Sequence, residues 1–346
     1  MKTCPGVLFA GLVLLSQTAA AGGTLVVLNK SEATASLIDL EAGNVVATLP
    51  TGEGPHEVAV SPDGRLALAS NYGTRVAPGS TLTLIDIPGA RVVKTIELGE
   101  YRRPHGVAWL QDGKRALVTA EAQKALLTID VEAGKVAGAI LTDQDVSHMV
   151  AVLPDGSRAF VANIGSGTVT AIDLSRGKVL AQIPTGKGAE GIDITPDGRQ
   201  VWVTNRAEDT VSVLDPSGLK SLATLESKAF PIRARATPDG KHVLVSNAKT
   251  GDVAVFDTRT RALVRRIGLQ AAAVKAEGRL LEFGDSSVPI GIAIDPAKQR
   301  AFVAHANADV ISIIDLLTWQ PKGTLTAGKE PDGMAYSPLT VKPGGR

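Results

Sequence analysis

A four-strand unit that recurs about every 42 residues limits the fold of this chain more than any other feature. Its clearest copy is residues 147–186, SHMVAVLPDGSRAFVANIGSGTVTAIDLSRGKVLAQIPTG. The copy holds four runs of alternating or β-branched residues, each too short for a helix. Gly, Asp and Pro residues, which are typical of tight turns, separate the runs. The unit therefore predicts four β-strands joined by short turns.

The turn that follows the first strand marks the other copies. The same turn position falls at residues 62, 111, 154, 196, 238, 296 and 338. Four of the six intervals are 42 or 43 residues, and the other two are 49 and 58 residues. A period near 42 with four strands in each unit is typical of a β-propeller blade. Seven first strands predict an all-β fold, a seven-bladed β-propeller.

The first and last units are incomplete, and they complete each other. Residues 24–50 match only the second, third and fourth strands, whereas residues 333–338 match only the first strand. Together they predict one blade that closes the ring and leaves no strand edge exposed. Residues 22–346 are therefore expected to form a single domain. Residues 72–80 and 271–288 lengthen the two long intervals, and both insertions are expected on the same face of the ring.

Two recurring polar residues are interpreted as parts of the scaffold. An Asp ends every third strand and is expected to accept hydrogen bonds from its own turn. These are Asp39, Asp86, Asp130, Asp173, Asp215, Asp257 and Asp315. An Asn ends five of the second strands, at Asn29, Asn71, Asn163, Asn205 and Asn247. The other two blades carry Ala120 and His305 at this position.

The repeated pattern resembles a known family. It consists of a small-residue strand ending in Asn, a strand ending in I-D, a G-K-V strand and a P-x-G-(I/V)-A-(I/V)-x-PDG segment. This order is similar to that of the YVTN-repeat β-propellers, which include the exported YncE-like proteins. The resemblance spans about residues 24–340 and implies the propeller fold. It leaves function open, because such proteins bind nucleic acid, metals or other proteins.

The N-terminus predicts export. Lys2, an apolar run over residues 7–15 and an Ala-Ala-Ala segment have the order of a secretory signal peptide, which we place at residues 1–21. The apolar run is too short to span a bilayer, so we expect a periplasmic or secreted protein and not an integral membrane protein. The single cysteine, Cys4, lies in this leader. No C-x-x-C-H motif is present, which excludes covalently attached haem.

The charge balance makes nucleic acid an improbable partner. Lys and Arg total 36, Asp and Glu total 35, and one lysine lies in the leader. The remaining chain therefore carries no net charge and has no long-range attraction for a phosphate backbone.

The residues at the start of the first strands differ from blade to blade. In chain order they are His56, His105, His148, Glu190, Ile232, Ile290 and Asp332. First strands are innermost in a propeller, so these side chains are expected to face one mouth of the central channel. We expect His305, from a connection on the same face, at that mouth as well. His56, His105, His148, Glu190 and His305 are therefore the candidate ligands of a divalent transition metal, zinc or copper.

Other residues are expected around this mouth. Tyr72, Arg103, Arg206 and Arg233 are candidates for contacting a small anionic or aromatic ligand. An alternative interpretation is a wet polar channel, in which the histidines bond only water and backbone.

Three classes of function follow from these residues. The favoured one is an exported accessory protein that binds a metal ion or small ligand, as a metallochaperone serving a periplasmic protein partner does. The second is an enzyme with a metal or a His/Glu acid–base pair at the same mouth, such as a lyase, a lactone hydrolase or an oxidoreductase. The third is a protein-interaction scaffold. The chain has no G-x-S-x-G, Walker or dinucleotide-binding motif, so binding is favoured over catalysis.

Overall fold

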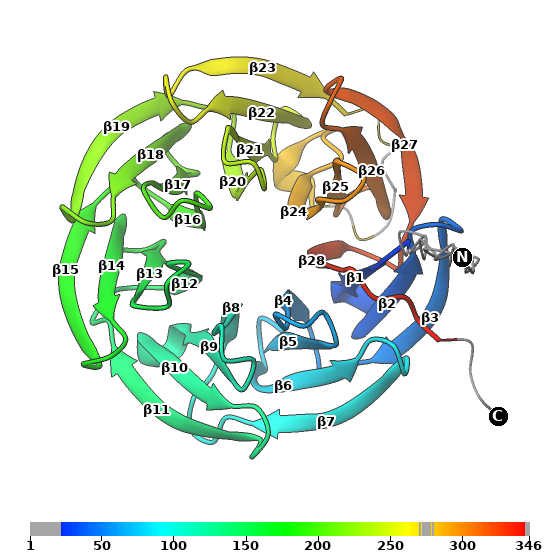
Figure 1. Ribbon diagram of the computed structural model, residues 1–346, viewed down its shortest axis with the longest axis horizontal. Helices are drawn as coiled ribbons and strands as arrows, with labels where there is room; N and C mark the ends of the chain where they lie inside the picture. Colours follow the sequence, from blue (N-terminus) through cyan, green and yellow to red (C-terminus); the bar gives the residue numbers. More distant parts are fainter. Residues whose placement is uncertain (1–21, 270, 272–277, 279, 343–346) are drawn as a thin grey trace, which may run out of the picture.

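Seven four-stranded antiparallel sheets stand in a ring around a central axis (Figure 1). The computed structural model describes residues 22–342 except 270, 272–277 and 279. The predicted leader, residues 1–21, and part of the predicted insertion at 271–288 lie outside the described residues. The ring confirms the seven-bladed, all-β propeller expected from the 42-residue period.

Blades 1 to 6 each take four consecutive strands, with the first strand innermost. Blade 1 consists of β4 (Pro55–Val60), β5 (Leu66–Gly73), β6 (Pro78–Asp86) and β7 (Arg91–Glu97). Blade 2 consists of β8 (Pro104–Trp109), β9 (Arg115–Ala120), β10 (Ala125–Asp130) and β11 (Lys135–Leu141). Blade 3 consists of β12 (Ser147–Val152), β13 (Arg158–Asn163), β14 (Thr168–Asp173) and β15 (Lys178–Pro184).

The next three blades repeat this order. Blade 4 consists of β16 (Ala189–Ile194), β17 (Val201–Asn205), β18 (Thr210–Asp215) and β19 (Lys220–Glu226). Blade 5 consists of β20 (Pro231–Ala236), β21 (His242–Asn247), β22 (Asp252–Asp257) and β23 (Leu263–Gly268). Blade 6 consists of β24 (Pro289–Asp295), β25 (Arg300–His305), β26 (Val310–Asp315) and β27 (Gln320–Thr326).

Blade 7 joins the two ends of the described chain. It consists of β28 (Pro331–Ser337), β1 (Thr24–Asn29), β2 (Thr34–Asp39) and β3 (Asn44–Pro50). β28 pairs antiparallel with β1, and Tyr336 lies opposite Leu25 (Figure 1). This pairing is the predicted closure of the ring. The inner strand was expected at residues 333–338, and β28 is shifted slightly toward the N-terminus of that range. The pairing leaves the inner edge of β1 covered by hydrogen bonds.

The core of the protein lies between neighbouring blades. Buried residues of the middle strands are mainly aliphatic, whereas the outermost strands are largely exposed. Leu68 and Leu82 of blade 1, for example, pack with Val118 and Leu127 of blade 2. Packing of this kind needs few large rings, which is consistent with an aromatic content of 3%.

The recurring Asp residues have the predicted turn role. Asp39 Oδ1 accepts hydrogen bonds from the backbone N–H groups of Glu41 and Ala42 at 2.8 and 2.9 Å. Asp315 makes the same two bonds in blade 6. These carboxylates stabilise the connections between third and fourth strands, so they belong to the scaffold.

The connections at one end of the ring carry the additional structure. Short 3₁₀ turns lie at Lys30–Glu32, Glu121–Gln123 and Leu281–Phe283. The insertion in blade 1 lengthens β5 and β6, so that Gly73 pairs with Pro78. In the described part of the chain, no helix has the length and apolar character needed to cross a membrane.

Candidate functional site

The inner strands aim consecutive side chains at the channel because their pairing is irregular at the start. The register of β4 with β5 shifts between Pro55 and Val58, and that of β8 with β9 shifts between Pro104 and Val107. Such bulges turn a strand locally and change the direction of its side chains. As a result His56 and Glu57, which are adjacent in the sequence, both reach the same group of polar residues.

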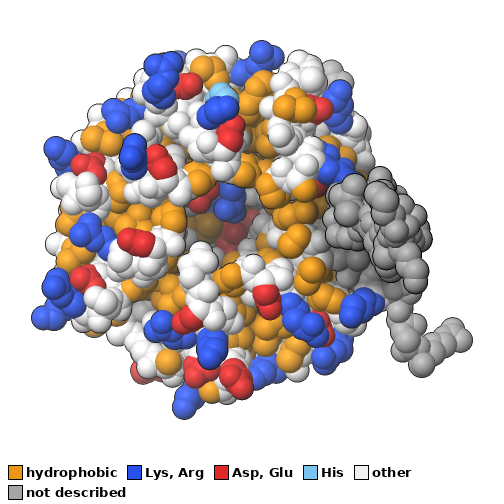
Figure 2. Space-filling model, viewed as in Figure 1, with side chains coloured by type: hydrophobic (Ala, Val, Ile, Leu, Met, Phe, Trp, Pro, Cys, Tyr) orange, Lys and Arg blue, Asp and Glu red, His pale blue; other side chains and the backbone are white. Residues whose placement is uncertain are grey.

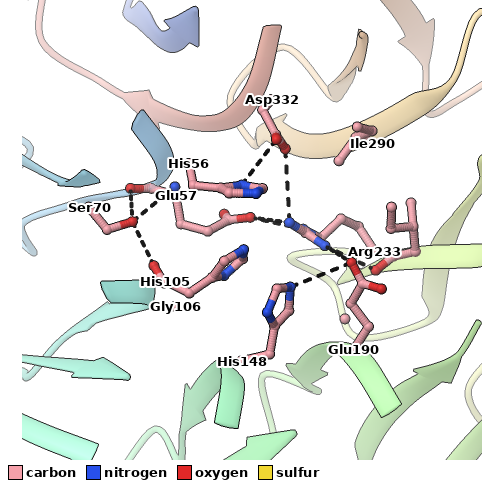
Figure 3. Close-up of polar contacts among 12 residues, drawn as sticks. His56, Glu57, Ser70, His105, Gly106, His148, Glu190, Arg233, Ile290 and Asp332 are labelled. Atoms are coloured by element: carbon pink, nitrogen blue, oxygen red, sulfur yellow. Dashed lines mark hydrogen bonds and ion pairs between the residues drawn. The ribbon is translucent and has the colours of Figure 1, made fainter. Parts of the chain in front are cut away.

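Hydroxyl groups from the second strands hold these bulges in place. Ser70 Oγ accepts a hydrogen bond from the Glu57 N–H and donates one to the carbonyl oxygen of His105, at 2.7 Å (Figure 3). Thr119 repeats the arrangement one blade later, donating to the carbonyl oxygen of His148 at 2.6 Å. His105 and His148 are therefore each positioned by the blade that precedes them.

The structure brings together the three predicted histidines of blades 1 to 3. The ring centres of His56 and His105 are 4.2 Å apart, and those of His105 and His148 are 3.4 Å apart (Figure 3). His105 is fully buried and His148 is 7% exposed. The outer pair, His56 and His148, is 6.4 Å apart between ring centres, so His105 lies between them.

Carboxylates contact the Nδ1 atoms of the two outer histidines. His148 Nδ1–H donates to Glu121 Oε1 at 2.5 Å, and Glu121 also accepts from the Tyr72 hydroxyl at 2.6 Å. His56 Nδ1 lies 3.0 Å from Asp332 Oδ2. Sequence reasoning did not identify Glu121, which opens the 3₁₀ turn after β9. It placed Asp332 in the inner column without assigning it to the site.

A second polar group surrounds Arg233, which is 5% exposed. Its guanidinium contacts Glu57, with Nε 3.0 Å from Oε1, and Glu190, with Nη1 3.1 Å from Oε1 (Figure 3). Asp332 lies 3.9 Å from Nη2. Glu190 also pairs with Arg206 at 2.6 Å and lies 3.5 Å from Nε2 of His148. The contacts of Arg233 thus connect the inner strands of blades 1, 4, 5 and 7.

These contacts keep the buried acids ionised. Burial alone would raise the pKa of Glu190, but contacts with His148, Arg206 and Arg233 outweigh it and lower the pKa to about 2. Burial likewise opposes ionisation of Asp332, whereas His56, Lys30 and Arg233 lower its pKa.

The histidines respond differently to burial. Burial, together with the nearby His148 and His56, holds the pKa of His105 well below its usual value, so His105 is neutral. Burial also lowers the pKa of His148, but Glu121 and Glu190 more than compensate and raise it. His148 therefore protonates more readily than His105.

The mouth has unpaired polar atoms beside a dense group of paired charges. Both ring nitrogens of His105 and Nε2 of His148 are buried without a hydrogen bond to any described residue. Acidic and basic side chains pair closely here, namely Glu57, Glu121, Glu190, Glu330, Asp332, Lys30, Arg206 and Arg233. Because the pKa of His148 is raised, a metal ion would compete with a proton for this ring.

Two sets of possible metal ligands lie in the described residues of this mouth. They are His56, Glu57 and His105, and His105, Glu121 and His148, with the ligand atoms in each set within 4.8 Å of one another. His105 belongs to both sets. Neutral imidazole and carboxylate groups are suitable ligands for zinc or copper.

Basic and acidic side chains also occupy the centre of the ring when it is viewed along its axis. Figure 2 shows a hollow there, surrounded by hydrophobic side chains. A cavity of about 540 Å³ runs along the inner strands and is lined by Val58, Val107, Val150, Ile192 and Arg235, among others. Space for a small molecule therefore remains inside the ring beside these charged side chains.

The other predicted ligand residues occupy two places at the mouth. The Arg103 guanidinium lies over the Tyr72 ring, 5.0 Å from its centre, in a neighbouring cavity of about 480 Å³ that Lys30 also lines. Burial and the adjacent Glu121 raise the pKa of Tyr72 to about 12. Arg206 and Arg233 line a different cavity, of about 420 Å³, together with His56 and His148. Lys30 lies between the two cavities.

The structure does not bring His305 into the histidine group. Its Nδ1 and Nε2 atoms hydrogen-bond with the hydroxyls of Ser287 and Ser312, both at 2.8 Å. Asn205 makes the corresponding bond to Ser212 in blade 4. His305 therefore takes the scaffold place of the recurring Asn, and burial lowers its pKa to about 4.

Replacing His305 with asparagine should make the protein less sensitive to acid. The pKa of His305 is lower in the folded chain than its ordinary value of 6.5, so the unfolded chain takes up this proton first. Stability is therefore lost as the pH falls from about 6.5 to about 4, by about 3 kcal/mol for this group. His305→Asn removes the titration and keeps a partner for Ser312. Urea unfolding of both proteins near pH 7 and near pH 4 measures the difference, and equal acid sensitivity would contradict the assignment.

Comparison with known proteins identifies the type of fold over part of the chain. Residues 177–276 match the family model described as Lactonase, 7-bladed beta-propeller. The matched span runs from the end of blade 3 to the connection after blade 5 and contains Glu190, Arg206 and Arg233. No curated protein matches the chain.

Two solved structures share the architecture. One is hydrazine synthase from Kuenenia stuttgartiensis, with a TM-score of 0.69, 19% identity, and coverage of 82% of this chain and 90% of that chain. The other is a functionally unknown protein from Desulfotomaculum acetoxidans DSM 771, with a TM-score of 0.75, 15% identity, and coverage of 93% of this chain and 100% of that chain. At these identities the similarity concerns the fold alone.

Proposed function

We propose that this protein is an exported, YVTN-type propeller that binds one divalent transition metal ion, zinc or copper, at the mouth of its channel. His56, His105 and His148 are the proposed protein ligands. The predicted leader at residues 1–21 supports a periplasmic or secreted location.

The observation that carries the proposal is the pairing of the outer histidines with carboxylates. Glu121 and Asp332 contact the Nδ1 atoms of His148 and His56, so a metal ion would bind both rings through Nε2, which in His56 accepts a hydrogen bond from Lys30. Metal-binding histidines are commonly oriented in this way by a carboxylate on the other ring nitrogen. The buried, neutral and unpaired ring of His105 lies between them.

Two neighbouring groups would adjust when the ion binds. The Lys30 ammonium donates to Nε2 of His56 at 3.2 Å, and its side chain is 30% exposed, so it can turn away toward Glu330. Glu190, held ionised by its arginines, lies beside Nε2 of His148 and is the proposed fourth ligand. At His148 the ion would replace the proton that Glu121 and Glu190 favour on this ring.

The position of the site suits transfer of the ion to another protein. Two of the proposed ligands, His56 and His148, also line the cavity of about 420 Å³ at the mouth. An exchanging ligand could therefore approach the ion from the channel without unfolding a blade. This arrangement supports a role as a metallochaperone for a periplasmic partner.

Titration of the metal-free protein with zinc tests the proposal. The protein should be prepared without a histidine tag and treated with a chelator before calorimetry. We expect one zinc ion per chain near pH 7.5, with weaker binding near pH 5.5 because protons compete for the imidazole nitrogens. Binding of less than a stoichiometric amount of both zinc and copper at the higher pH would contradict it.

The match to the lactonase family favours a second candidate function, hydrolysis of a lactone. Three residues of the matched span, Glu190, Arg206 and Arg233, line the cavity beside the histidines. Addition of water across the ester C–O bond would open the ring to a hydroxy-carboxylate, and Arg206 is placed to bind that carboxylate. The metal-free and zinc-loaded preparations should be compared on γ- and δ-lactones. Zinc-dependent hydrolysis supports this candidate, and inactivity of both preparations removes it.

A further inference from the structure

The mouth has an apolar wall that the metal site does not use. Around the ring, the inner column reads histidine in blades 1 to 3 but isoleucine in blades 5 and 6, at Ile232 and Ile290. These isoleucines pack with Val288, and Phe230 and Phe283 lie against them. Phe283 belongs to the 3₁₀ turn at Leu281–Phe283, so the described end of the insertion contributes to the wall.

The apolar wall and the histidines enclose one cavity. Its volume is about 420 Å³. Its lining joins the apolar residues Ile232, Ile290 and Phe283 to His56, His148 and the acidic residues Glu190, Glu282, Glu330 and Asp332. Cavities of roughly 300–1,000 Å³ that combine apolar walls with a few polar groups are typical of small-molecule sites.

Two cations flank the aromatic part of this wall. The Arg206 guanidinium lies 5.4 Å from the centre of the Phe230 ring, and the Lys249 ammonium lies 5.2 Å from it. Phe230 in turn meets Phe283 edge-on, with ring centres 5.2 Å apart. Arg206 is half-buried and pairs with Glu190.

Lys249 differs from Arg206 in having no acidic partner. No carboxylate of the described residues forms an ion pair with it, and its side chain is exposed at the rim of the cavity. An ammonium over an aromatic ring, next to an apolar wall, is suited to an anion with an apolar body.

We propose that this cavity binds a small organic carboxylate with an aryl or alkyl body. The carboxylate lies between Lys249 and Arg206, and the body lies against Ile232, Ile290 and Phe283. The other end of the molecule then faces His56 and His148. This inference deepens the proposed function by naming the class of ligand held beside the ion, but its contacts can be tested without the ion.

Calorimetry with 3-phenylpropionate, and with the uncharged 3-phenylpropanol as a comparison, tests this site. We expect the acid to bind more tightly than the alcohol. Lys249→Met should lower the affinity for the acid by about tenfold and should change the affinity for the alcohol little. Phe283→Ala should lower the affinity for both probes, because the apolar wall contacts the phenyl ring that they share. Lys220→Met, an exposed lysine at the start of the outermost strand β19, is the matched control and should change neither affinity.

The outcomes separate this inference from the metal site. The affinities for both probes should be measured on metal-free and on zinc-loaded protein. Selective binding of the acid that depends on Lys249 supports the inference even if zinc does not bind. Zinc binding without any binding of the acid overturns the inference and leaves the metal site intact. Equal affinities for acid and alcohol, or an unchanged affinity in Lys249→Met, also overturn it.

Discussion

Replacing His105 with alanine is expected to lower zinc affinity at least about 100-fold, because even residues that only orient a metal ligand commonly contribute 10–100-fold. His105 is the shared member of both possible ligand sets. No other described ring of the group can replace it, since His56 and His148 lie on either side of it. Calorimetric titration of the chelator-treated variant measures this loss.

The same substitution should leave the metal-free fold nearly as stable as before. Both nitrogens of His105 are buried without hydrogen bonds, so removing the ring breaks no polar contact with a described residue. An unsatisfied buried polar group is itself unfavourable, which offsets part of the packing lost with the ring. Zinc at 100 times the wild-type dissociation constant should stabilise the wild type by about 2.7 kcal/mol and the variant by at most about 0.4 kcal/mol.

Two further variants make the result specific. Glu121→Gln keeps the contact to His148 but removes the negative charge, and we expect zinc affinity to fall by about 10–100-fold. His305→Asn removes a histidine outside the group and should bind zinc as the wild type does. Unchanged zinc affinity in His105→Ala would place the ion elsewhere and overturn the proposed site.

The sequence predicted the ring and its closure because both depend on backbone periodicity. Strand alternation and turn residues recur in every unit, and the two partial units at residues 24–50 and 333–338 complement each other. The inner column also predicted His56, His105 and His148 together, since equivalent positions of neighbouring blades lie at similar height.

The partners of these histidines could not be predicted from alternation. Alternation sends residues 56 and 57 to opposite faces of a strand, but the bulge brings both to the mouth. One signal was available in the sequence. The position after the column residue is glycine in four blades, and Glu57 and Arg233 replace it in blades 1 and 5. A charged residue at a glycine position of an inner strand indicated a contact inside the channel.

The expectation for His305 shows the limit of grouping residues by chemical type. His305 stands at the Asn position of blade 6, and its ring makes hydrogen bonds with hydroxyls as Asn205 does in blade 4. The position in the repeat therefore indicated a scaffold role more reliably than the imidazole indicated a metal ligand.

Arg233→Met is expected to lower the free energy of unfolding by about 3–5 kcal/mol near neutral pH, because it leaves buried carboxylates without their shared cation. Arg233 contacts Glu57 and Glu190 directly and lies near Asp332. Burial of the guanidinium is unfavourable, but these three acids outweigh it and raise the pKa of Arg233. Methionine has a similar length and preserves the packing of the side chain, so the loss reports mainly on charge.

The pH dependence of this loss follows from the acids. In the wild type the pKa values of Glu190 and Asp332 are lowered by folding, so their stabilising contribution is present above the ordinary carboxyl range. That contribution disappears as the pH falls through the lowered values. In Arg233→Met the acids lose a cation, their pKa values rise, and they protonate on folding at a higher pH. The difference in stability between the two proteins should therefore be large near pH 7 and smaller near pH 4.

Arg235 provides the matched control on the same strand. It lies two residues further along β20, its side chain is 45% exposed, and it reaches Asp193 at 3.7 Å. An exposed ion pair of this kind contributes about 0–1 kcal/mol, so Arg235→Met should unfold almost as the wild type does. In addition, Glu57→Gln introduced into Arg233→Met should recover part of the lost stability, because it removes one of the uncompensated charges. Equal stability losses in Arg233→Met and Arg235→Met, or no recovery with Glu57→Gln, would show that the buried ion pairs of Arg233 do not stabilise the fold.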